Sequence, residues 1–172
     1  YVCSSDLIIV AVGFCLSKSV SPVLGYKGLD HLPVDSAIAT VFEQVIAVRS
    51  SKLPDPAVLA NCGSFFKNPV ITKQHYTELK VKHADMPGFI QPDGSIKVAA
   101  AWLMEQQGFK GQRVGEVGCY QLQPLVIVNH GAGTAVQLEQ LVTAIQQRVL
   151  SAYNIQLEAE VRMLNGAGQP VR

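Results

Sequence analysis

The feature that most constrains the fold is a helix pattern followed directly by a strand pattern near the end of the 172-residue chain. Residues 134–153 begin with the capping box Thr-Ala-Val-Gln, and apolar side chains then recur at helical spacing from Leu138 to Val149. Residues 155–164 alternate between apolar and charged side chains, which indicates a strand with one buried face. We therefore expect an α+β fold in which helices pack on a small mixed sheet.

The polar face of this strand carries Glu158, Glu160 and Arg162. On a solvated edge these side chains would form an ordinary charged face, because surface charge pairs contribute little to stability. In a cleft, a carboxylate and a guanidinium that project the same way would form an acid or electrostatic stabiliser beside an anion-binding group. The alternation alone leaves both interpretations open.

Residues 61–69, Asn-Cys-Gly-Ser-Phe-Phe-Lys-Asn-Pro, hold the densest group of chemically useful side chains. Gly63 permits a positive φ, and Ser64 then presents a hydroxyl that can donate or accept a hydrogen bond. In an extended run Phe65 and Phe66 point to opposite sides, so that one ring can anchor in a core while the other lines a cleft. The segment reads either as a core strand after a tight turn or as part of a reactive site.

The first fifty residues predict a strand and a helix. Residues 7–16 are apolar on both faces, which predicts a strand covered on both sides. Residues 35–49 carry apolar side chains at helical spacing. Pro54 and Pro56 then keep the backbone extended, so we place a domain boundary near residue 50.

Between the two ends of the chain the patterns are shorter. Residues 72–82 predict a polar helix, and Ser95 is positioned to cap a second helix that ends near Gly108. Residues 109–123 contain three glycines and predict loops with short strands, and residues 125–128 predict a buried strand.

Composition excludes several classes of protein. Only 16% of the residues are charged and the formal net charge is +1, so the chain lacks the basic field of a nucleic-acid-binding protein. No apolar run reaches 18 residues, so we expect no membrane partner and a cytoplasmic location. The sequence also lacks the glycine patterns of Rossmann and P-loop nucleotide sites.

The four cysteines, Cys3, Cys15, Cys62 and Cys119, lie far apart and form no C-x-x-C pair. This spacing argues against structural zinc and favours reduced core residues. A hydrolase built on Cys62 or Cys119 stays open, although no local signature supports it. A serine hydrolase built on Ser64 lacks the G-x-S-x-G elbow.

Three separated motifs resemble those of UDP-N-acetylenolpyruvoylglucosamine reductases, the MurB flavoenzymes. They are Gly-Ser-Phe-Phe-Lys-Asn-Pro at residues 63–69, Asp-Gly-Ser-Ile-Lys-Val-Ala-Ala-Ala-Trp-Leu at 93–103, and Leu-Glu-Ala-Glu-Val-Arg at 157–162. Their order and spacing agree with the family, and the similarity runs from about residue 7 to residue 164. The chain looks closest to the type I enzymes, in which a tyrosine before the substrate domain, here Tyr26, reaches over the site.

This resemblance implies that NADPH reduces FAD and that hydride then passes to C3 of the enolpyruvyl group of UDP-N-acetylglucosamine enolpyruvate. In the family the motif serine, which falls on Ser64, donates the proton to C2. The family glutamate falls on Glu160, which supports the enolate-like intermediate with Arg162. A serine hydroxyl is a weak acid in water, so Lys67 or a bound water would have to lower its pKa.

The resemblance also places substrate contacts at Arg49, Lys52, Asn68, Lys97 and Gln123. Lysine side chains at two of these positions would act as point charges toward a diphosphate. The chain departs from many type I members at Phe89, where they carry a tyrosine directed at the diphosphate.

The family's N-terminal FAD-binding region has no counterpart in this sequence. We interpret residues 1–50 as the end of the flavin domain, 51–153 as the substrate-binding domain, and 154–172 as a return strand and tail. We expect this chain alone to bind no FAD and to be inactive. The alternative is a non-catalytic module that binds a nucleotide sugar.

Overall fold

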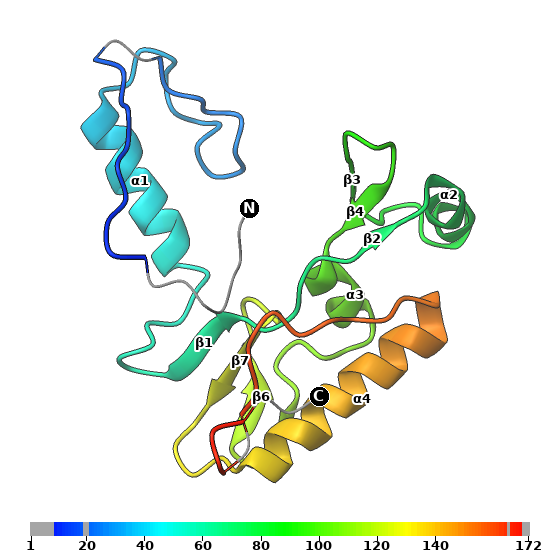
Figure 1. Ribbon diagram of the computed structural model, residues 1–172. Helices are drawn as coiled ribbons and strands as arrows, with labels where there is room; N and C mark the ends of the chain where they lie inside the picture. The colour runs from blue at the N-terminus through cyan, green and yellow to red at the C-terminus, as the bar shows by residue number, and fades with distance from the viewer. Residues whose placement is uncertain (1–8, 19–20, 165, 170–172) are drawn as a thin grey trace. The chain divides into compact units, whose positions relative to one another are not determined.

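The computed structural model describes residues 9–18, 21–164 and 166–169, and the chain divides into two compact units, Tyr1–Val48 and Arg49–Arg172 (Figure 1). Its elements are α1 (Ile38–Ser50), β1 (Ala60–Ser64), β2 (Val70–Ile71), α2 (Lys73–Lys82), β3 (Gly88–Ile90), β4 (Ile96–Val98), α3 (Ala100–Gln106), β5 (Arg113–Val114), β6 (Val117–Cys119), β7 (Val126–Asn129) and α4 (Ala135–Tyr153). No helix in the described part of the chain is long and apolar enough to cross a membrane.

In the first unit, the prediction of a strand over residues 7–16 is wrong for the described residues 9–16. Residues 9–16 form no strand, and the side chains of Val10 and Phe14 are 92% and 80% exposed. No described strand pairs with this run, so it has neither ladder hydrogen bonds nor apolar cover. Residues 7 and 8 lie outside the described residues. The predicted helix is confirmed as α1, although none of its side chains is buried.

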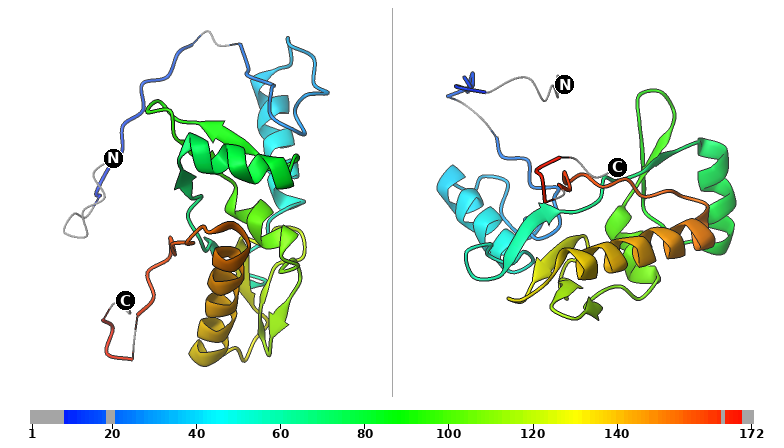
Figure 2. Two further views of the ribbon diagram at one scale, coloured as in Figure 1. Left: turned by 90° about the vertical axis from the view of Figure 1, so that its right-hand side faces the viewer. Right: turned by 60° about the horizontal axis from the view of Figure 1, so that its bottom comes forward.

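The second unit confirms the α+β class and corrects the predicted sheet. In place of one mixed sheet it has two antiparallel sheets, a four-stranded one in the order β1-β7-β6-β5 and a three-stranded one in the order β2-β4-β3. Each strand is at most five residues long, so the sheets depend on the helices for burial. Figure 2 shows α4 running beside β6 and β7 at one end and towards α2 at the other.

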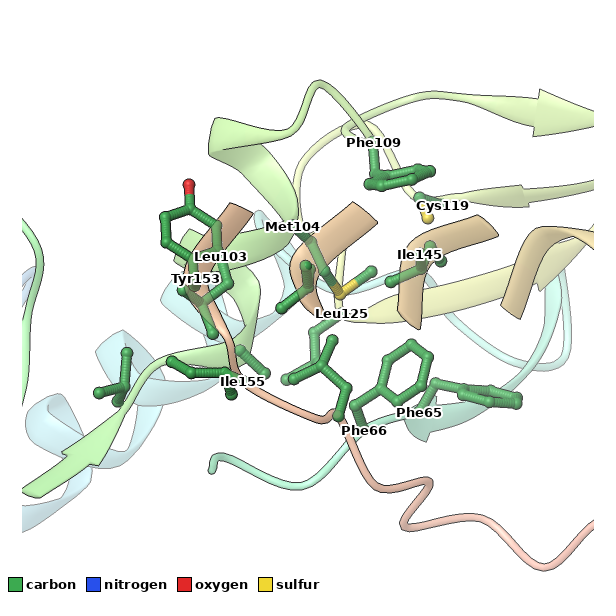
Figure 3. Close-up of a cluster of buried hydrophobic side chains, with 14 of the residues drawn as sticks. Phe65, Phe66, Leu103, Met104, Phe109, Cys119, Leu125, Ile145, Tyr153 and Ile155 are labelled. Carbon is green, nitrogen blue, oxygen red and sulfur yellow. The ribbon is translucent and has the colours of Figure 1, made fainter. Parts of the chain in front are cut away.

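Helix α4 confirms the strongest prediction. Thr134 and Gln137 form the predicted capping box, and α4 buries Leu141, Val142, Ile145, Val149 and Tyr153. These side chains meet residues from α3, β4, β6 and the segment after β1 in one core (Figure 3). Asn154 ends the helix in the left-handed conformation, with φ +52°.

The helix predicted between Ser95 and Gly108 is confirmed in its second half as α3, but its predicted start at Ser95 is wrong. Residues 96–98 form β4, and α3 starts only at Ala100. Ser95 bonds to Asp93 and does not cap a helix. Asp93 Oδ1 accepts hydrogen bonds from the Ser95 amide at 3.0 Å and from the Ser95 hydroxyl at 2.6 Å. These bonds close the β3–β4 turn, and the next residues pair with both neighbouring strands.

Candidate functional site

The Ser64 side chain is presented by a β-bulge in β1. Asn61 pairs with Val128 and Ser64 pairs with Val126, so β1 contains one extra residue over this interval. Gly63 lies in the bulge with φ +78°, and its amide donates to Asn61 Oδ1 at 3.0 Å. The predicted positive φ is therefore confirmed. Ser64 is exposed at the end of the strand, and its hydroxyl makes no hydrogen bond among the described residues.

The chain beyond Ser64 leaves β7 and pairs with the segment that follows α4. The Phe65 amide donates to the Leu125 carbonyl, and the Phe65 carbonyl accepts from the Glu160 amide, both at 2.8 Å. The Lys67 amide donates to the Glu158 carbonyl at 2.9 Å. Figure 1 shows these two stretches of chain crossing beside β1. Two remote parts of the sequence thus form one short antiparallel ladder.

The strand predicted for residues 155–164 is only partly formed. Between residues 155 and 163 the structure has one isolated bridge, Phe66 with Ala159, and no regular strand. The backbone bends at Glu160 and Val161, which ends the pairing. The predicted alternation is confirmed in burial, because Leu157 is buried and Glu158, Glu160 and Arg162 are exposed.

The prediction that Phe65 and Phe66 separate onto opposite sides is wrong. Both side chains are 1% exposed, and their ring centroids lie 5.1 Å apart in an edge-on arrangement. Figure 3 shows both rings in the core with Leu125. The change of partner strand at Phe65 breaks the regular alternation, so the aromatic pair anchors the segment and leaves its flanking residues, Ser64 and Lys67, exposed.

The structure brings Ser64 and Glu160 into adjacent positions, since Glu160 is hydrogen-bonded to the residue that follows Ser64. Glu160 and Arg162 line an open cavity of about 860 Å³ with Val142 and Gln146 of α4. Arg162 also lines a second cavity of about 520 Å³ that includes Cys62. Among the described residues the Glu160 carboxylate forms no ion pair.

Asn68 and Lys97 lie where the serine segment meets the three-stranded sheet. Asn68 Oδ1 accepts a hydrogen bond from the Ala100 amide at 2.9 Å, so this side chain satisfies the first amide of α3. Lys97 lies on the central strand β4, opposite Val70 on one side and Phe89 on the other. Phe89 is 61% exposed beside it.

The remaining predicted substrate residues are more dispersed. Arg49 lines an open cavity of about 640 Å³ together with Gly63, next to Ser64. Lys52 is exposed in the turn after α1, and Gln123 is half-buried beside β7. Tyr26 belongs to the first unit, where its side chain is 64% exposed.

Two of the three described cysteines do not lie in the core. Cys15 and Cys62 are exposed, and Cys119 is buried, all three as free thiols. Cys3 lies outside the described residues. Burial raises the pKa of Cys119 to about 12. A nucleophilic thiolate therefore does not form readily at Cys119, which argues against the hydrolase interpretation at this residue.

Most of the amides that the glycine-containing turn before α4 could offer to the pyrophosphate of FAD are already bonded within the chain. Such a group binds to backbone amides that are free at a helix start. Here Asn129 Oδ1 accepts from the amides of Gly131 and Gly133 at 2.9 and 3.0 Å. The capping box occupies the amides of Thr134 and Gln137. These internal bonds occupy four of the amides that a pyrophosphate at this turn and helix start would need.

The sequence did not reveal two contacts of this region. Lys67 Nζ forms an ion pair with Glu158 Oε1 at 2.5 Å, whereas from the sequence we expected either Lys67 or a bound water to act on Ser64. Asn68 caps α3, which no local helix signal indicated. Both contacts depend on the register between remote segments. The alternation at residues 155–164 indicated only that Glu158 lies on the polar face, not which residue it pairs with.

Comparison with known proteins gives concordant matches. The model of the family described as "UDP-N-acetylenolpyruvoylglucosamine reductase, C-terminal domain" matches residues 55–164. UDP-N-acetylenolpyruvoylglucosamine reductase of Vibrio cholerae is 44% identical over 157 residues, which cover 91% of this chain and 45% of that protein. The enzyme of Pasteurella multocida is 42% identical over 167 residues, covering 96% and 49%.

Among solved structures, UDP-N-acetylenolpyruvylglucosamine reductase (MurB) from Thermus caldophilus matches with a TM-score of 0.42 at 24% identity. That match covers 72% of this chain and 35% of the other. The chain spans about half the length of the curated relatives that it matches.

Proposed function

The chain belongs to the UDP-N-acetylenolpyruvoylglucosamine reductase family, and we propose that it supplies the substrate-binding half of a reductase that converts UDP-N-acetylglucosamine enolpyruvate to UDP-N-acetylmuramate for peptidoglycan synthesis. The family implies hydride delivery to C3 from FAD reduced by NADPH. Since four amides of the turn before α4 are already bonded within the chain, we assign to the described residues only substrate binding and the proton transfer at C2.

In this proposal the Ser64 hydroxyl protonates C2 after hydride has added at C3. Hydride addition leaves negative charge at C2 and on the neighbouring carboxylate, so the reaction needs a nearby acid and fixed positive or hydrogen-bonding groups. Arg162 supplies positive charge, and Glu160 supports the enolate-like intermediate together with it. Lys97, Asn68 and Gln123 contact the nucleotide diphosphate and uridine.

The observation that carries the proposal is the hydrogen bond from the Glu160 amide to the Phe65 carbonyl at 2.8 Å. This bond fixes the backbone of the proposed stabilising residue next to that of the proposed acid. The bulge at Gly63 places Ser64 at the exposed end of β1. An acid and an electrostatic group held on neighbouring strands are the minimal set for protonating a carbanion next to a carboxylate.

Substrate binding can be tested with the chain itself. We expect UDP-N-acetylglucosamine enolpyruvate to shift the amide resonances of Ser64, Asn68 and Lys97 in an isotopically labelled sample, with saturation. An absence of saturable shifts would contradict the proposed binding half.

Proton transfer requires a chimera in which this chain replaces the aligned 157 residues of the Vibrio cholerae enzyme. We expect the chimera with Ser64→Ala to reduce its flavin with NADPH as fast as the parent chimera. Reoxidation of that flavin by substrate should fall by about 10² to 10⁴, the usual contribution of a positioned acid. Ser151→Ala, at an exposed serine on α4, is the matched control. Equal reoxidation rates in the parent and Ser64→Ala chimeras would instead favour a binding module without chemistry.

A further inference from the structure

We propose that Lys67 and Glu158 form an electrostatic clamp that holds the Glu160 segment against the Ser64 segment. Both are positioning residues, since they act through the backbone ladder and not on the substrate. The relevance of the clamp to catalysis rests on the proposed roles of Ser64 and Glu160. The existence of the clamp does not depend on those roles, because hydrogen exchange tests it in the absence of catalysis.

The ion pair lies at one end of the ladder and the proposed catalytic pair at the other. Lys67 and Glu158 are opposite each other, joined by a backbone hydrogen bond of 2.9 Å and by the Nζ–Oε1 contact of 2.5 Å. The Phe66–Ala159 bridge follows, and then the 2.8 Å bond between the Glu160 amide and the Phe65 carbonyl. A displacement of Glu158 therefore acts on Glu160 across a single intervening residue.

The segment that carries Glu160 has few other attachments. Gln146 Nε2 of α4 donates to the Leu157 carbonyl at 2.9 Å, and Ile155 and Leu157 are buried. Beyond Leu157 the side chains are exposed or half-buried, and the backbone bends at Glu160. Ala159, Val161 and Met163 pack against the core but are only half-buried, so the Glu160 side of the ladder opens locally more readily than a fully buried core strand. The Lys67–Glu158 ion pair at one end of the ladder should therefore lower the rate of this local opening measurably.

The sequence separation of the pair also sets it apart. The structure has three ion pairs among its described residues, and two of them join residues that are close in the chain, Lys110 with Glu105 and Arg113 with Glu116. Of these three pairs, the Lys67–Glu158 pair alone joins segments that are remote in the sequence. An ion pair within a helix terminus or hairpin supports local structure, whereas this one determines how two segments lie together.

Hydrogen exchange of the Glu160 amide in the intact chain measures the opening of the ladder directly. Reversal of one charge removes the attraction of an exposed ion pair and replaces it with repulsion. We expect Lys67→Glu to speed exchange of the Glu160 amide about three- to tenfold. Glu158→Lys should do the same. The charge-swapped double variant, K67E with E158K, should return the rate to within about twofold of the parent, and Lys67→Arg should stay near the parent.

The matched control is the Lys110–Glu105 pair, whose Nζ–Oε1 distance of 2.6 Å and partial exposure are similar. Lys110→Glu should leave exchange at Glu160 unchanged. Urea unfolding of every variant separates local opening from global loss of stability, because only local opening changes Glu160 without changing the most protected core amides. The clamp is refuted if Lys67→Glu leaves Glu160 exchange unchanged, or if the charge swap fails to restore it. Either result would stand even if Ser64 proves catalytic.

Discussion

The side-chain oxygen of Asn68 accepts a hydrogen bond from the Ala100 amide at 2.9 Å, and this single contact ties the serine segment to the start of α3. The next carbonyl, that of Pro69, accepts from the Val98 amide at 2.9 Å. Lys97 directly precedes Val98 on β4. The position of Lys97 relative to Ser64 is therefore set by the backbone and by the Asn68 side chain.

Asn68→Ala should destabilise the chain by about 1 kcal/mol, because it removes the acceptor for an amide at a helix start. Asn68→Asp keeps that oxygen and should unfold close to the parent in urea. If the Asn68 NH₂ group also contacts substrate, Asn68→Asp should weaken substrate binding in calorimetry while stability is preserved. Equal losses of stability in both variants would show that the capping contact does not act as described.

The bulge at Gly63 leads to a second prediction. Gly63 has φ +78° and open space where a Cβ would lie, so Gly63→Ala is opposed by backbone strain and not by a clash. We expect a loss of about 1 kcal/mol in the free energy of unfolding, together with a shift of the Ser64 amide resonance.

Gly94→Ala is the control, because Gly94 has φ +82° and equally open space but lies in the β3–β4 turn. It should cost a similar free energy and leave the Ser64 resonance in place. A Ser64 resonance that responds equally to both substitutions would argue against a bulge that presents the serine.

Local sequence patterns correctly predicted the features that depend on neighbouring residues in the chain. The capping box at Thr134 and the apolar stripe of α4 predicted a helix, and the predicted left-handed Gly63 is observed. Ser95 shows where local patterns are insufficient, because its cap pattern is equally compatible with a turn. In the structure its hydroxyl donates to Asp93 in a turn and does not cap a helix.

The failures concern contacts between remote segments. Phe65 and Phe66 share the core because the chain changes its partner strand between them, which no alternation rule anticipates. Residues 7–16 were predicted to form a buried strand because both faces are apolar, but burial requires a neighbour, and none of the described elements supplies one to residues 9–16. The candidate site was found through motifs, while its ladder and its ion pair became visible only in three dimensions.

The buried thiol of Cys119 predicts a dependence of stability on alkaline pH. Its pKa rises from 9.0 to about 12 on folding, so the folded chain keeps a proton that the unfolded chain releases. The stabilisation is fully present below pH 9 and is lost as the pH rises towards 12. The parent should therefore lose about 1 kcal/mol more than Cys119→Ala between pH 8 and pH 10, in urea unfolding at each pH. Parallel curves would contradict the assignment.

Phe89 predicts a gain of affinity. It lies opposite Lys97 in the β3–β4 register and is 61% exposed, so Phe89→Tyr adds a hydroxyl at the surface beside the lysine without disturbing the core. If Lys97 meets the substrate diphosphate, the new hydroxyl can donate to the same group. A hydrogen bond of this kind is worth about 0.5–1.5 kcal/mol, so calorimetry should show two- to tenfold tighter binding of UDP-N-acetylglucosamine enolpyruvate.

Two controls separate this contact from a general effect of an added tyrosine. Val81→Tyr places the same side chain at an exposed position on α2 and should leave affinity unchanged. Uridine, which lacks the diphosphate, should bind the parent and Phe89→Tyr equally. A rise in uridine affinity that matches the rise for the nucleotide sugar would place Phe89 beside the base and not beside the diphosphate. That outcome would also move the proposed role of Lys97 away from the phosphates, because the two residues are paired across the same strands.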